Sequence, residues 1–392
     1  MHIHFIANKL NLQRGGSNRS LYLLASALVE VGHQVTVHTL NFSHPNEVPT
    51  EAPFELDAHP SGGSTYAHIR QVRALLTGVR EIADIIHIFE PSMIPVAGLT
   101  NDAAGPPMVG RLNTYPLFCT NVARMRDGCW NQCSTARKLV HDDANLPRRL
   151  AQLPLYPART HIVPRKAGRI DQLIAVSPAV KEVHISNGVP ADRISVIPSF
   201  ADPGFTDGAP MFPVEGPIER LLYVGRLSPE KGVGSLIEAL RGVDTPLQLD
   251  VIGSGTEEAS LKARVADPSF AHEVRFHGWV DYAELGPYYR RADVFVHPSV
   301  WPEPLGRTVF EAIQSGCYPI VSDVGGPPWV IGDHRLCFPP GDSAALGQII
   351  DAVRDNQELR ASLSKRIQHR FDHFNRSKNV ERMTDLYKAL LM

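Results

Sequence analysis

Short apolar runs alternate with helical patterns along this chain, and the alternation begins twice. The first run, IHFIA at residues 3–7, leads through the glycine-containing turn NLQRGGSNRS into the amphipathic stretch LYLLASALVEVG and then into the apolar run QVTVHTL. Strands joined by helices pair in parallel, and the helices then cover both faces of the sheet. Four further runs follow: ADIIHIF, PMVGRL, DQLIAVS and ISVIPS. The pattern predicts a doubly wound α/β domain over residues 1–199.

The alternation breaks at residues 200–220 and then resumes. The segment FADPGFTDGAPMFPVEGPIER is rich in Pro, Gly and acidic residues and has no period, as expected of a linker. A second doubly wound domain is predicted over residues 221–371, from the runs RLLYVGRL, LQLDVIG, VRFHGWV, DVFVHPS, YPIVSD and LCFPP. Residues 372–392 read as one or two terminal helices. Ligands of open α/β sheets bind outside the carboxyl ends of the strands, so the chemistry is expected in a cleft between two facing domains.

Composition excludes several classes of protein. A chain of 392 residues with 43% hydrophobic content is too long for one ordinary core, which agrees with two domains. The chain has 39 basic and 41 acidic residues, a balance that argues against a nucleic-acid binder. The opening MHIHFIANKL lacks the features of a secretory signal, and no window holds 18 consecutive apolar residues. Five cysteines without an export signal are expected to be reduced thiols, so we expect a cytoplasmic protein.

Basic residues concentrate in one part of the chain. Residues 111–169 contain eleven Lys or Arg but three acidic residues, Asp127, Asp142 and Asp143. One interpretation is a solvated surface. The other is a surface that attracts an anionic acceptor, such as a lipid-linked phosphate, or the anionic membrane itself, which would place the protein peripherally at the inner membrane face.

The stretch WPEPLGRTVFEAIQSG, residues 301–316, places two glutamates around a strand-to-helix turn. Its prolines predict that the helix starts near Leu305 or Gly306, with Glu303 in the loop and Glu311 one to two turns inside. Carboxylates accept hydrogen bonds from sugar hydroxyls, while backbone N–H groups and a helix dipole suit phosphate. This combination fits a sugar nucleotide. A capped helix with two solvated glutamates is the alternative.

A second motif, YVGRLSPEKG at residues 223–232, directly follows the first strand of the second predicted domain. Gly225 and Gly232 let the backbone approach a ligand closely. Arg226 and Lys231 are two cations five residues apart, which could hold a diphosphate whose charge grows as it leaves. A solvated turn is the alternative, although two such clusters near one crevice favour a ligand site.

The segments GRLSPEKG and HPSVWPEPLGRTVFEAIQSGCYPIVSDVGG, together with GGSNRSLYLLASALVEVGHQVTVHTL, resemble the retaining glycosyltransferases of family 4. The resemblance spans nearly the whole chain. It implies the GT-B architecture, in which two doubly wound Rossmann-like domains face each other across a cleft. It also implies that residues 1–199 form the acceptor-side domain, that residues 221–371 bind the nucleotide sugar, and that the C-terminal helix at 372–392 packs back on the first domain.

The same resemblance implies roles for individual residues. Arg226 and Lys231 match the diphosphate-binding pair, Glu303 matches the glutamate that contacts the donor sugar, and Glu311 matches the one that holds the ribose hydroxyls. Arg226, Lys231 and Glu303 are therefore the expected catalytic residues. The expected donor-binding residues are Gly15, Gly16, Gly225, Arg226, Lys231, Gly278, Val280, Glu303, Leu305, Gly306, Arg307 and Glu311.

The resemblance also implies a set of acceptor-side residues, and the sequence departs from the family pattern at two positions. Asn113 stands where many relatives have a histidine, which keeps hydrogen bonding but loses any titratable role. Trp329 stands where relatives have a glutamate, and it either stacks on a sugar or fills the core. The donor's identity stays open for these reasons. The expected acceptor-side residues are Asn18, His87, which should follow a strand, Arg111, Asn113 and Tyr115.

The implied reaction moves a sugar from a nucleotide diphosphate, a UDP- or GDP-sugar, to a hydroxyl of a glycan, a lipid-linked acceptor or a small molecule. The anomeric configuration is retained, and a leaving phosphate oxygen takes the acceptor proton. No Asp-x-Asp metal motif occurs, so neither a metal nor another cofactor is expected. Cys119, Cys129 and Cys133 with His141 could supply four zinc ligands, but their spacing is irregular, and a reduced structural loop is preferred.

Other functions stay open with less support. An epimerase lacks this signature, and a phosphorylase of the same shape would need a lysine motif for pyridoxal phosphate. A dinucleotide oxidoreductase would need Gly-x-Gly-x-x-Gly after the first strand, which is missing. A non-catalytic sugar-nucleotide-binding protein would carry the same residues as a transferase, so an activity measurement has to separate the two.

Overall fold

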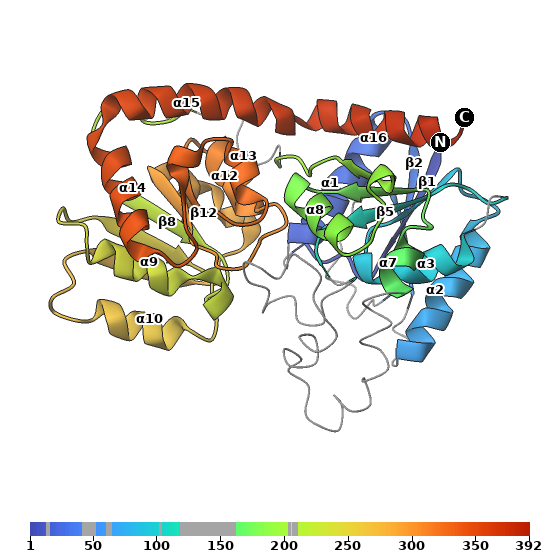
Figure 1. Cartoon of the computed structure of the whole chain (residues 1–392), viewed down its shortest axis with the longest axis horizontal. Coiled ribbons are helices and arrows are strands. Elements are labelled where there is room, and N and C mark those ends of the chain that lie inside the picture. The colour runs from blue at the N-terminus through green and yellow to red at the C-terminus, as the bar shows by residue number, and fades with distance from the viewer. Residues whose placement is uncertain are drawn as a thin grey trace. The chain divides into compact units, whose positions relative to one another are not determined.

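The computed structural model describes residues 1–12, 16–40, 52–59, 65–101, 104–115, 117, 162–202, 205 and 211–392. These residues divide into two compact units, one made of Met1–Ser199 with Arg376–Met392 and the other of Phe200–Asn375. Each unit is a parallel sheet with helices on both faces (Figure 1). The prediction of two doubly wound Rossmann-like folds is confirmed.

The first unit contains a seven-stranded sheet in the order β3-β2-β1-β4-β5-β6-β7. Every pair of neighbouring strands is parallel. The strands are β1 (His2–Ala7), β2 (Gln34–Thr39), β3 (Glu55–Ala58), β4 (Ile85–Ile88), β5 (Met108–Leu112), β6 (Gln172–Ala175) and β7 (Ile194–Val196). The longer helices are α1 (Gly16–Glu30), α2 (Thr65–Val79), α3 (Ile94–Thr100), α7 (Val163–Ala167), α8 (Pro178–Ser186) and α16 (Arg376–Leu390).

The second unit contains a six-stranded parallel sheet in the order β10-β9-β8-β11-β12-β13. Its strands are β8 (Arg220–Val224), β9 (Gln248–Ile252), β10 (Glu273–Gly278), β11 (Val294–His297), β12 (Tyr318–Ser322) and β13 (Cys337–Phe338). Its helices are α9 (Val233–Leu240), α10 (Glu258–Val265), α11 (Gly286–Arg291), α12 (Arg307–Gln314), α13 (Pro327–Ile331), α14 (Ser343–Asp355) and α15 (Gln357–Phe371).

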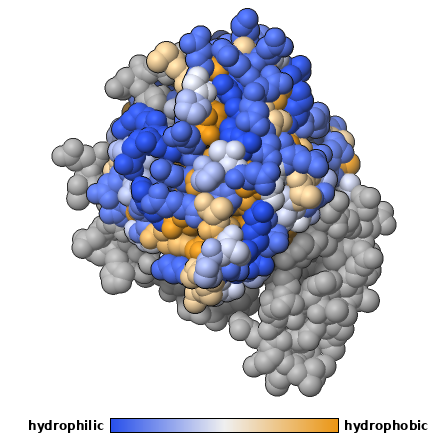
Figure 2. Space-filling model, turned by 90° about the vertical axis from the view of Figure 1, so that its left-hand side faces the viewer, coloured by the Kyte–Doolittle hydropathy of each residue, from blue (hydrophilic) through white to orange (hydrophobic). Residues whose placement is uncertain are grey.

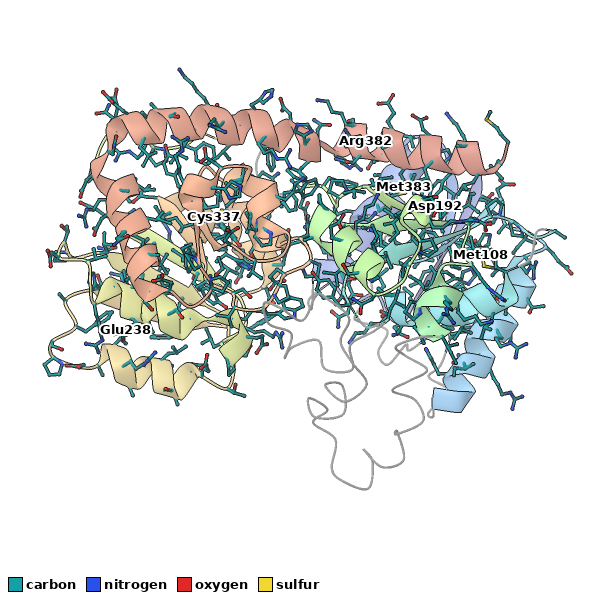
Figure 3. All side chains as sticks on the ribbon, in the orientation of Figure 1. Met108, Asp192, Glu238, Cys337, Arg382 and Met383 are labelled. Atoms are coloured by element: carbon teal, nitrogen blue, oxygen red, sulfur yellow. The ribbon has the colours of Figure 1, made fainter. Side chains whose placement is uncertain are left out.

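The strands form where the sequence has its apolar runs, because strands covered on both faces bury almost every side chain. All five residues of β5 and of β12 are buried. Met108 on β5 and Met383 on α16, labelled in Figure 3, have exposed fractions of 0% and 1%. The sequence analysis did not predict β3, whose run ELDA has two acidic residues and whose residues are all at least partly exposed.

The described residues of the segment 200–220, which was expected to be a linker, belong to the second unit and pack on it. The ring of Phe205 lies 5.2 Å from that of Tyr282 and 5.4 Å from that of Tyr289. The buried guanidinium of Arg360 on α15 donates hydrogen bonds to the carbonyls of Val214 and Gly216. A segment without a period can therefore still be held by specific contacts.

The terminal helix α16 belongs to the first unit. It packs on α1, and the Arg376 guanidinium forms two 2.6 Å hydrogen bonds with the Glu30 carboxylate. The Tyr387 hydroxyl lies 2.6 Å from Nδ1 of His87 on β4. The first unit is thus built from both ends of the chain.

Among the described residues, we find no helix with the length and apolar character needed to cross a membrane. Seen from the side of α10 and α14, the surface is mostly hydrophilic and its apolar residues lie in small groups (Figure 2).

Candidate functional site

The order of the second sheet determines which loops can form a site. The chain runs outward from β8 to β9 and β10, and then returns to the other side of β8 with β11. At such a switch point the loops after the two central strands diverge and leave room for a ligand. The loop after β8 carries Arg226 and Lys231, and the loop after β11 carries Glu303, so these two motifs start from neighbouring strands of one sheet.

Lys231 is the cation that the structure joins to a glutamate of the other loop. Its Nζ hydrogen-bonds and ion-pairs with Oε1 of Glu303, 72 residues further along the chain. The same Nζ lies 5.0 Å from the centre of the Trp301 ring. The Lys231 and Glu303 side chains are 15% and 14% exposed, so both charges are largely screened from water. The pair is a preorganised, largely buried ion pair at the switch point of the second sheet.

Arg226 is much more open to solvent. Its side chain is 67% exposed, and its guanidinium lies 3.0 Å from Oε1 of Glu230. Glu230 connects the two loops, because its backbone carbonyl accepts hydrogen bonds from the Ser299 hydroxyl at 3.0 Å and from the N–H groups of Val300 and Trp301. Arg226 is therefore an exposed cation whose partner, Glu230, is held by its backbone to the other loop.

Gly232 explains how the two loops come so close. Its φ of 68° is left-handed, and a Cβ at this position would lie 2.0 Å from the Pro298 carbonyl oxygen. Only glycine tolerates both conditions. Gly325 is similar after β12, with a φ of 76° and room for no Cβ beside the backbone of Glu303. The positions of Lys231 and Glu303 thus depend on two glycines, Gly232 and Gly325, which carry no charge themselves but allow the loops to approach each other.

The helix α12 begins as the sequence analysis expected. Gly306 caps its N-terminus with a φ of 84° and without a side-chain hydrogen bond, and Arg307 is the first helical residue. Leu305 just before it is buried. The amides of residues 305–307 lie at the positive end of the helix, where anions are stabilised.

Glu311 lies deeper than a ribose contact would suggest. The residue is 3% exposed. Its carboxylate accepts a 2.9 Å hydrogen bond from the Tyr289 hydroxyl and lies 3.7 Å from Nε of Arg307. Burial raises the pKa of Glu311, and the Arg307 guanidinium acts in the opposite direction. In this structure Glu311 orients Arg307 and Tyr289; a direct ligand contact stays a prediction.

The end of β10 and the loop after it contain two of the expected donor-binding residues, Gly278 and Val280. Gly278 has a φ of 67°, and its carbonyl accepts a 2.7 Å hydrogen bond from the Gly253 N–H. Val280 is half-buried, and Trp279 between them is 58% exposed. Gly225, at the end of β8, donates its N–H to the Ile252 carbonyl at 3.0 Å. These contacts tie the ends of β8, β9 and β10 together.

In the first unit the corresponding switch lies between β1 and β4, and Asn113, after the next strand β5, contacts residues that follow these two strands. Its amide donates to the Ser17 hydroxyl at 2.8 Å and to the Phe89 carbonyl at 3.2 Å. Gly16 is exposed at the start of α1, and Asn18 is half-buried in the first turn of this helix. Gly15 lies outside the described residues.

Glu90 is a candidate that the sequence analysis missed. It directly follows Phe89 at the end of β4, and its carboxylate accepts a 3.1 Å hydrogen bond from the Ser92 hydroxyl. Burial raises the pKa of Glu90, and the bonds from Ser92 and Asn8 pull it back. An acidic residue between a strand and Pro91 was the signal that could have identified it.

Three of the expected acceptor-side residues are core residues. His87 lies inside β4 and not after it, is fully buried, and has a pKa well below its ordinary value because of burial and the nearby Arg111. Arg111 is 2% exposed, and burial lowers its pKa to about 10. Tyr115 has an exposed fraction of 0%. Position after an apolar run did not distinguish these buried polar groups from surface ones.

Trp329 fills space within the second unit. The guanidinium of Arg370 lies 5.0 Å from its ring centre, and the ring of Phe374 meets it edge-on at 5.1 Å. This is the packing interpretation of the two that the sequence left open. Cys119, Cys129, Cys133 and His141 lie outside the described residues, as does most of the basic stretch.

Both halves of the chain are similar to known glycosyltransferases. The description "Glycosyltransferase Family 4" matches residues 14–205, and "Glycosyl transferases group 1" matches residues 215–370. A phosphatidyl-myo-inositol mannosyltransferase of Mycobacterium leprae is 33% identical over 184 residues, which are 45% of this chain and 46% of that protein. The first curated relatives are thus matched over about half of their length.

Two longer matches add to this. A phosphatidyl-myo-inositol mannosyltransferase of Mycolicibacterium smegmatis is 27% identical over 380 residues, covering 91% of this chain and 86% of that protein. The crystal structure of Anabaena HepE in complex with UDP superimposes with a TM-score of 0.75 at 18% identity, covering 99% of this chain and 100% of that one. The second likeness shows the fold. With both halves matched and the fold shared, the chain belongs to glycosyltransferase family 4 and has the GT-B fold.

Proposed function

We propose that this protein transfers a sugar from a nucleotide diphosphate to a hydroxyl acceptor with retention of anomeric configuration. The observation that carries the proposal is the Lys231–Glu303 pair at the switch point of the second sheet, in which Glu303 belongs to the loop before α12, a helix without a side-chain cap. The pair provides a cation for phosphate and a carboxylate for hydroxyls within one hydrogen bond of each other. Family membership makes a UDP- or GDP-sugar the proposed donor.

Charge stabilisation is the proposed source of catalysis. When the glycosidic bond to phosphate breaks, negative charge grows on the departing diphosphate. Lys231 is preorganised to meet that charge, and the exposed Arg226 can close on it from solvent. The amides of residues 305–307 and the α12 dipole add to the same effect. With these groups in place, we propose that no metal ion is needed.

Retention requires the acceptor oxygen to attack on the face from which the phosphate leaves. In the proposed step the acceptor hydroxyl forms the new bond to the anomeric carbon as the bond to phosphate breaks. Its proton passes to the departing phosphate oxygen, so no protein base is consumed. Glu303 would hold the donor sugar, and Glu311 would act on the ribose either directly or by orienting Arg307.

An anionic acceptor is proposed for two reasons. The basic stretch at residues 111–169 has a local excess of cations. Two of the relatives named above are phosphatidyl-myo-inositol mannosyltransferases. A lipid acceptor would bring the protein to the inner face of the membrane as a peripheral protein. Binding to anionic vesicles that grows weaker with salt would support this, and binding that needs high salt would refute it.

A thermal-shift screen tests the donor. A ligand that binds only the folded state raises the melting temperature, so UDP-, GDP-, ADP- and TDP-sugars should separate, with a UDP- or GDP-sugar giving the largest rise. Proton NMR of the product should then show the donor's anomeric configuration, and activity should survive a chelator. An inverted product would refute the mechanism. Binding without donor hydrolysis or transfer would favour a non-catalytic sugar-nucleotide-binding protein.

A further inference from the structure

One face of the sheet edge formed by β1, β2 and β3 is polar, although the strands of a doubly wound sheet are normally apolar on both faces. Along these strands and at the end of β3, this face carries seven side chains with an imidazole, a hydroxyl or a carboxylate, beside the buried Ile6 of β1 and the exposed Gln34 of β2. The intervening residues include Ile3, Phe5, Val35 and Val37, all buried. The polar row consists of His2 and His4 on β1, Thr36 and His38 on β2, and Glu55, Asp57 and His59 along β3 and its end.

Strand register brings this row together. His38 on β2 is the parallel-ladder partner of Asp57 on β3, and His4 on β1 is the partner of Thr36. Partners in adjacent strands project from the same face of a sheet, and so do residues two apart on one strand. His59 therefore shares the face of Asp57. The arrangement follows from the backbone and does not depend on one chosen side-chain conformation.

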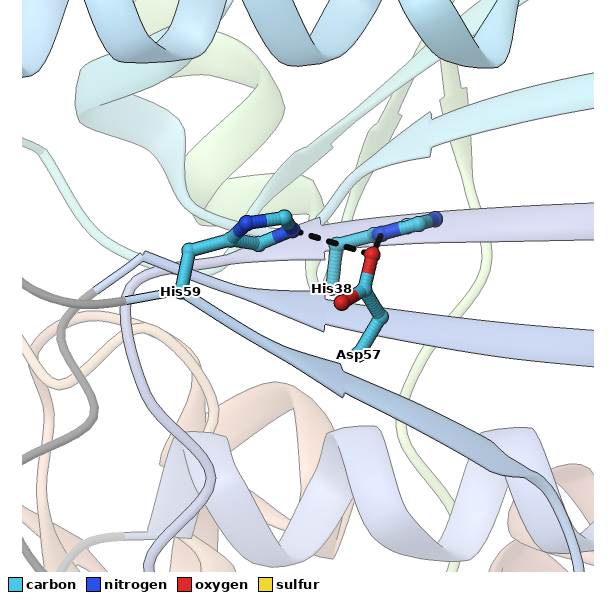
Figure 4. A group of neighbouring side chains, drawn as sticks. All are labelled: His38, Asp57 and His59. Atoms are coloured by element: carbon cyan, nitrogen blue, oxygen red, sulfur yellow. Dashed lines mark hydrogen bonds and ion pairs between the residues drawn. The ribbon is translucent and has the colours of Figure 1, made fainter.

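Three ligand atoms converge at the open end of the row, as Figure 4 shows. Nδ1 of His38 lies 2.9 Å and Nε2 of His59 lies 3.0 Å from Oδ2 of Asp57. The three donor atoms all lie within 4.8 Å of one another. The side chain of His38 is 5% exposed, whereas Asp57 and His59 are 46% and 32% exposed. The cluster thus has a buried wall and an entrance from solvent.

These separations are close to those of a coordinated ion. Imidazole nitrogen and carboxylate oxygen bind Zn²⁺ at about 2.0–2.1 Å, and a tetrahedral angle then separates neighbouring ligand atoms by about 3.3 Å. The two observed distances need to grow by roughly 0.4 Å to admit an ion. Rotation of the half-exposed His59 and Asp57 side chains is enough for this, while His38 stays in place.

His4 supports the buried ligand. Its Nδ1 lies 2.9 Å from Nε2 of His38, the ring nitrogen that faces away from Asp57. Ligand histidines usually have such a partner, which fixes the ring and its tautomer. His4 is 1% exposed, and its Nδ1 can accept a hydrogen bond from the Nε2–H of His38 when Nδ1 of His38 serves as the ligand atom.

We propose that His38, Asp57 and His59 bind a divalent transition-metal ion such as Zn²⁺, which links β2 to the edge strand β3. Two imidazoles and one carboxylate suit such ions better than Mg²⁺. Three protein ligands leave a position for water. The ion would have a structural role in the first unit, apart from the sugar-transfer machinery proposed above. It also differs from the sequence analysis, which expected no metal and did not consider these three residues.

The experiment uses the tag-free full chain, freed of metal with a chelator, and titrates it with Zn²⁺ in a calorimeter. We expect one tightly bound equivalent and a higher melting temperature with Zn²⁺. His59→Ala and Asp57→Asn should each weaken the binding by more than about 100-fold, the upper end of the loss caused by changing a supporting residue. Mg²⁺ should not compete. Both side chains are partly exposed, so the variants should fold.

Two controls separate this site from other histidines. His277→Ala breaks a His277–Asp250 pair at 2.5 Å, with side chains 25% and 26% exposed, which also joins neighbouring parallel strands but has two ligands. His334→Ala alters the cluster of Asp323, His334 and Cys337. Both controls should bind Zn²⁺ as the unaltered protein does. The proposal is overturned if the unaltered protein binds no stoichiometric Zn²⁺, or if His59→Ala binds as tightly as the controls.

Discussion

Replacing Lys231 by Met removes one charge from the proposed donor site and keeps most of the apolar side chain. In the structure this charge lies between the Glu303 carboxylate and the Trp301 ring, with little exposure to water. Removing it leaves Glu303, 14% exposed, without its cation. The substitution should therefore affect both catalysis and stability, and the two effects can be separated.

Each effect has an expected size. Breaking a fully buried ion pair costs about 3–5 kcal/mol, and an exposed pair is worth about 0–1 kcal/mol. With side chains 15% and 14% exposed, this pair should lie nearer the buried case, so we expect a loss of about 2–3 kcal/mol in the free energy of unfolding. Loss of a group that stabilises developing charge should lower turnover by about 10²–10³-fold.

A double-mutant cycle distinguishes the two effects. The variant Lys231→Met with Glu303→Gln has no uncompensated charge, so urea unfolding should show most of the lost stability restored. Turnover, measured as release of the nucleoside diphosphate, should stay low in both variants. Lys262→Met is the matched control, because Lys262 and Glu258 form a 2.8 Å pair that is 52% and 30% exposed. It should change stability by less than about 1 kcal/mol and leave turnover unchanged.

Two results for Lys231→Met would contradict these expectations. If Lys231→Met is folded and its turnover is within a few-fold of the unaltered protein, Lys231 does not stabilise the departing charge. If its stability matches that of the Lys262→Met control, the pair is not held as a buried pair and the energetic argument is wrong.

Three further predictions concern stability and the glycines around the site. Arg360, 4% exposed, donates four hydrogen bonds to backbone carbonyls, so Arg360→Met should lower the free energy of unfolding in urea by about 3–5 kcal/mol, and a loss below about 1 kcal/mol would contradict this. Gly253→Ala, at a φ of 123° and with its Cβ 1.9 Å from the Gly225 carbonyl oxygen, should lower the melting temperature and weaken donor binding, and an unchanged pair of values would refute the close approach. Hydrogen bonds from Arg335 lower the pKa of Asp333, so the contribution of Asp333 to stability is present above the ordinary Asp pKa and is lost as the pH falls through the lowered value. The free energy of unfolding of Asp333→Asn, measured in urea, should therefore depend less on pH over that range. A pH profile equal to that of the unaltered protein would contradict this.

The sequence predicted the fold well because both domains repeat one local pattern. Apolar runs separated by helical patterns are enough to indicate a parallel sheet, and the prolines before Leu305 were enough to place the start of α12 within two residues. β3 was missed because it is a short edge strand without an apolar run. Its only large apolar residue, Leu56, stands between two acidic residues and gives a weak signal.

Side-chain partners far apart in the sequence could not be predicted in this way. His87 forms a hydrogen bond with Tyr387, 300 residues further along the chain. The apolar run around His87 does not indicate that its partner in the core is a tyrosine hydroxyl. Glu311 was correctly placed on α12, but the buried Tyr289, whose hydroxyl donates a hydrogen bond to the Glu311 carboxylate, lies on another helix, α11. The polar row on β1, β2 and β3 could have been predicted, because its polar residues repeat with the period of two that is typical of strands. It was missed because strands were identified from their apolar residues alone.

The return of α16 to the first unit affects the order in which the chain can be completed during synthesis. Residues Phe200–Asn375 form one continuous unit, so all of its contacts are available as soon as that segment has left the ribosome. Residues 1–199 are synthesised earlier, yet Val380, Met383 and Tyr387 of α16, which are buried in the first unit, follow only after residues 200–375. Until α16 has been synthesised, the surface of the first unit that receives it stays open to water and to chaperones, so the unit begun first is completed after the second.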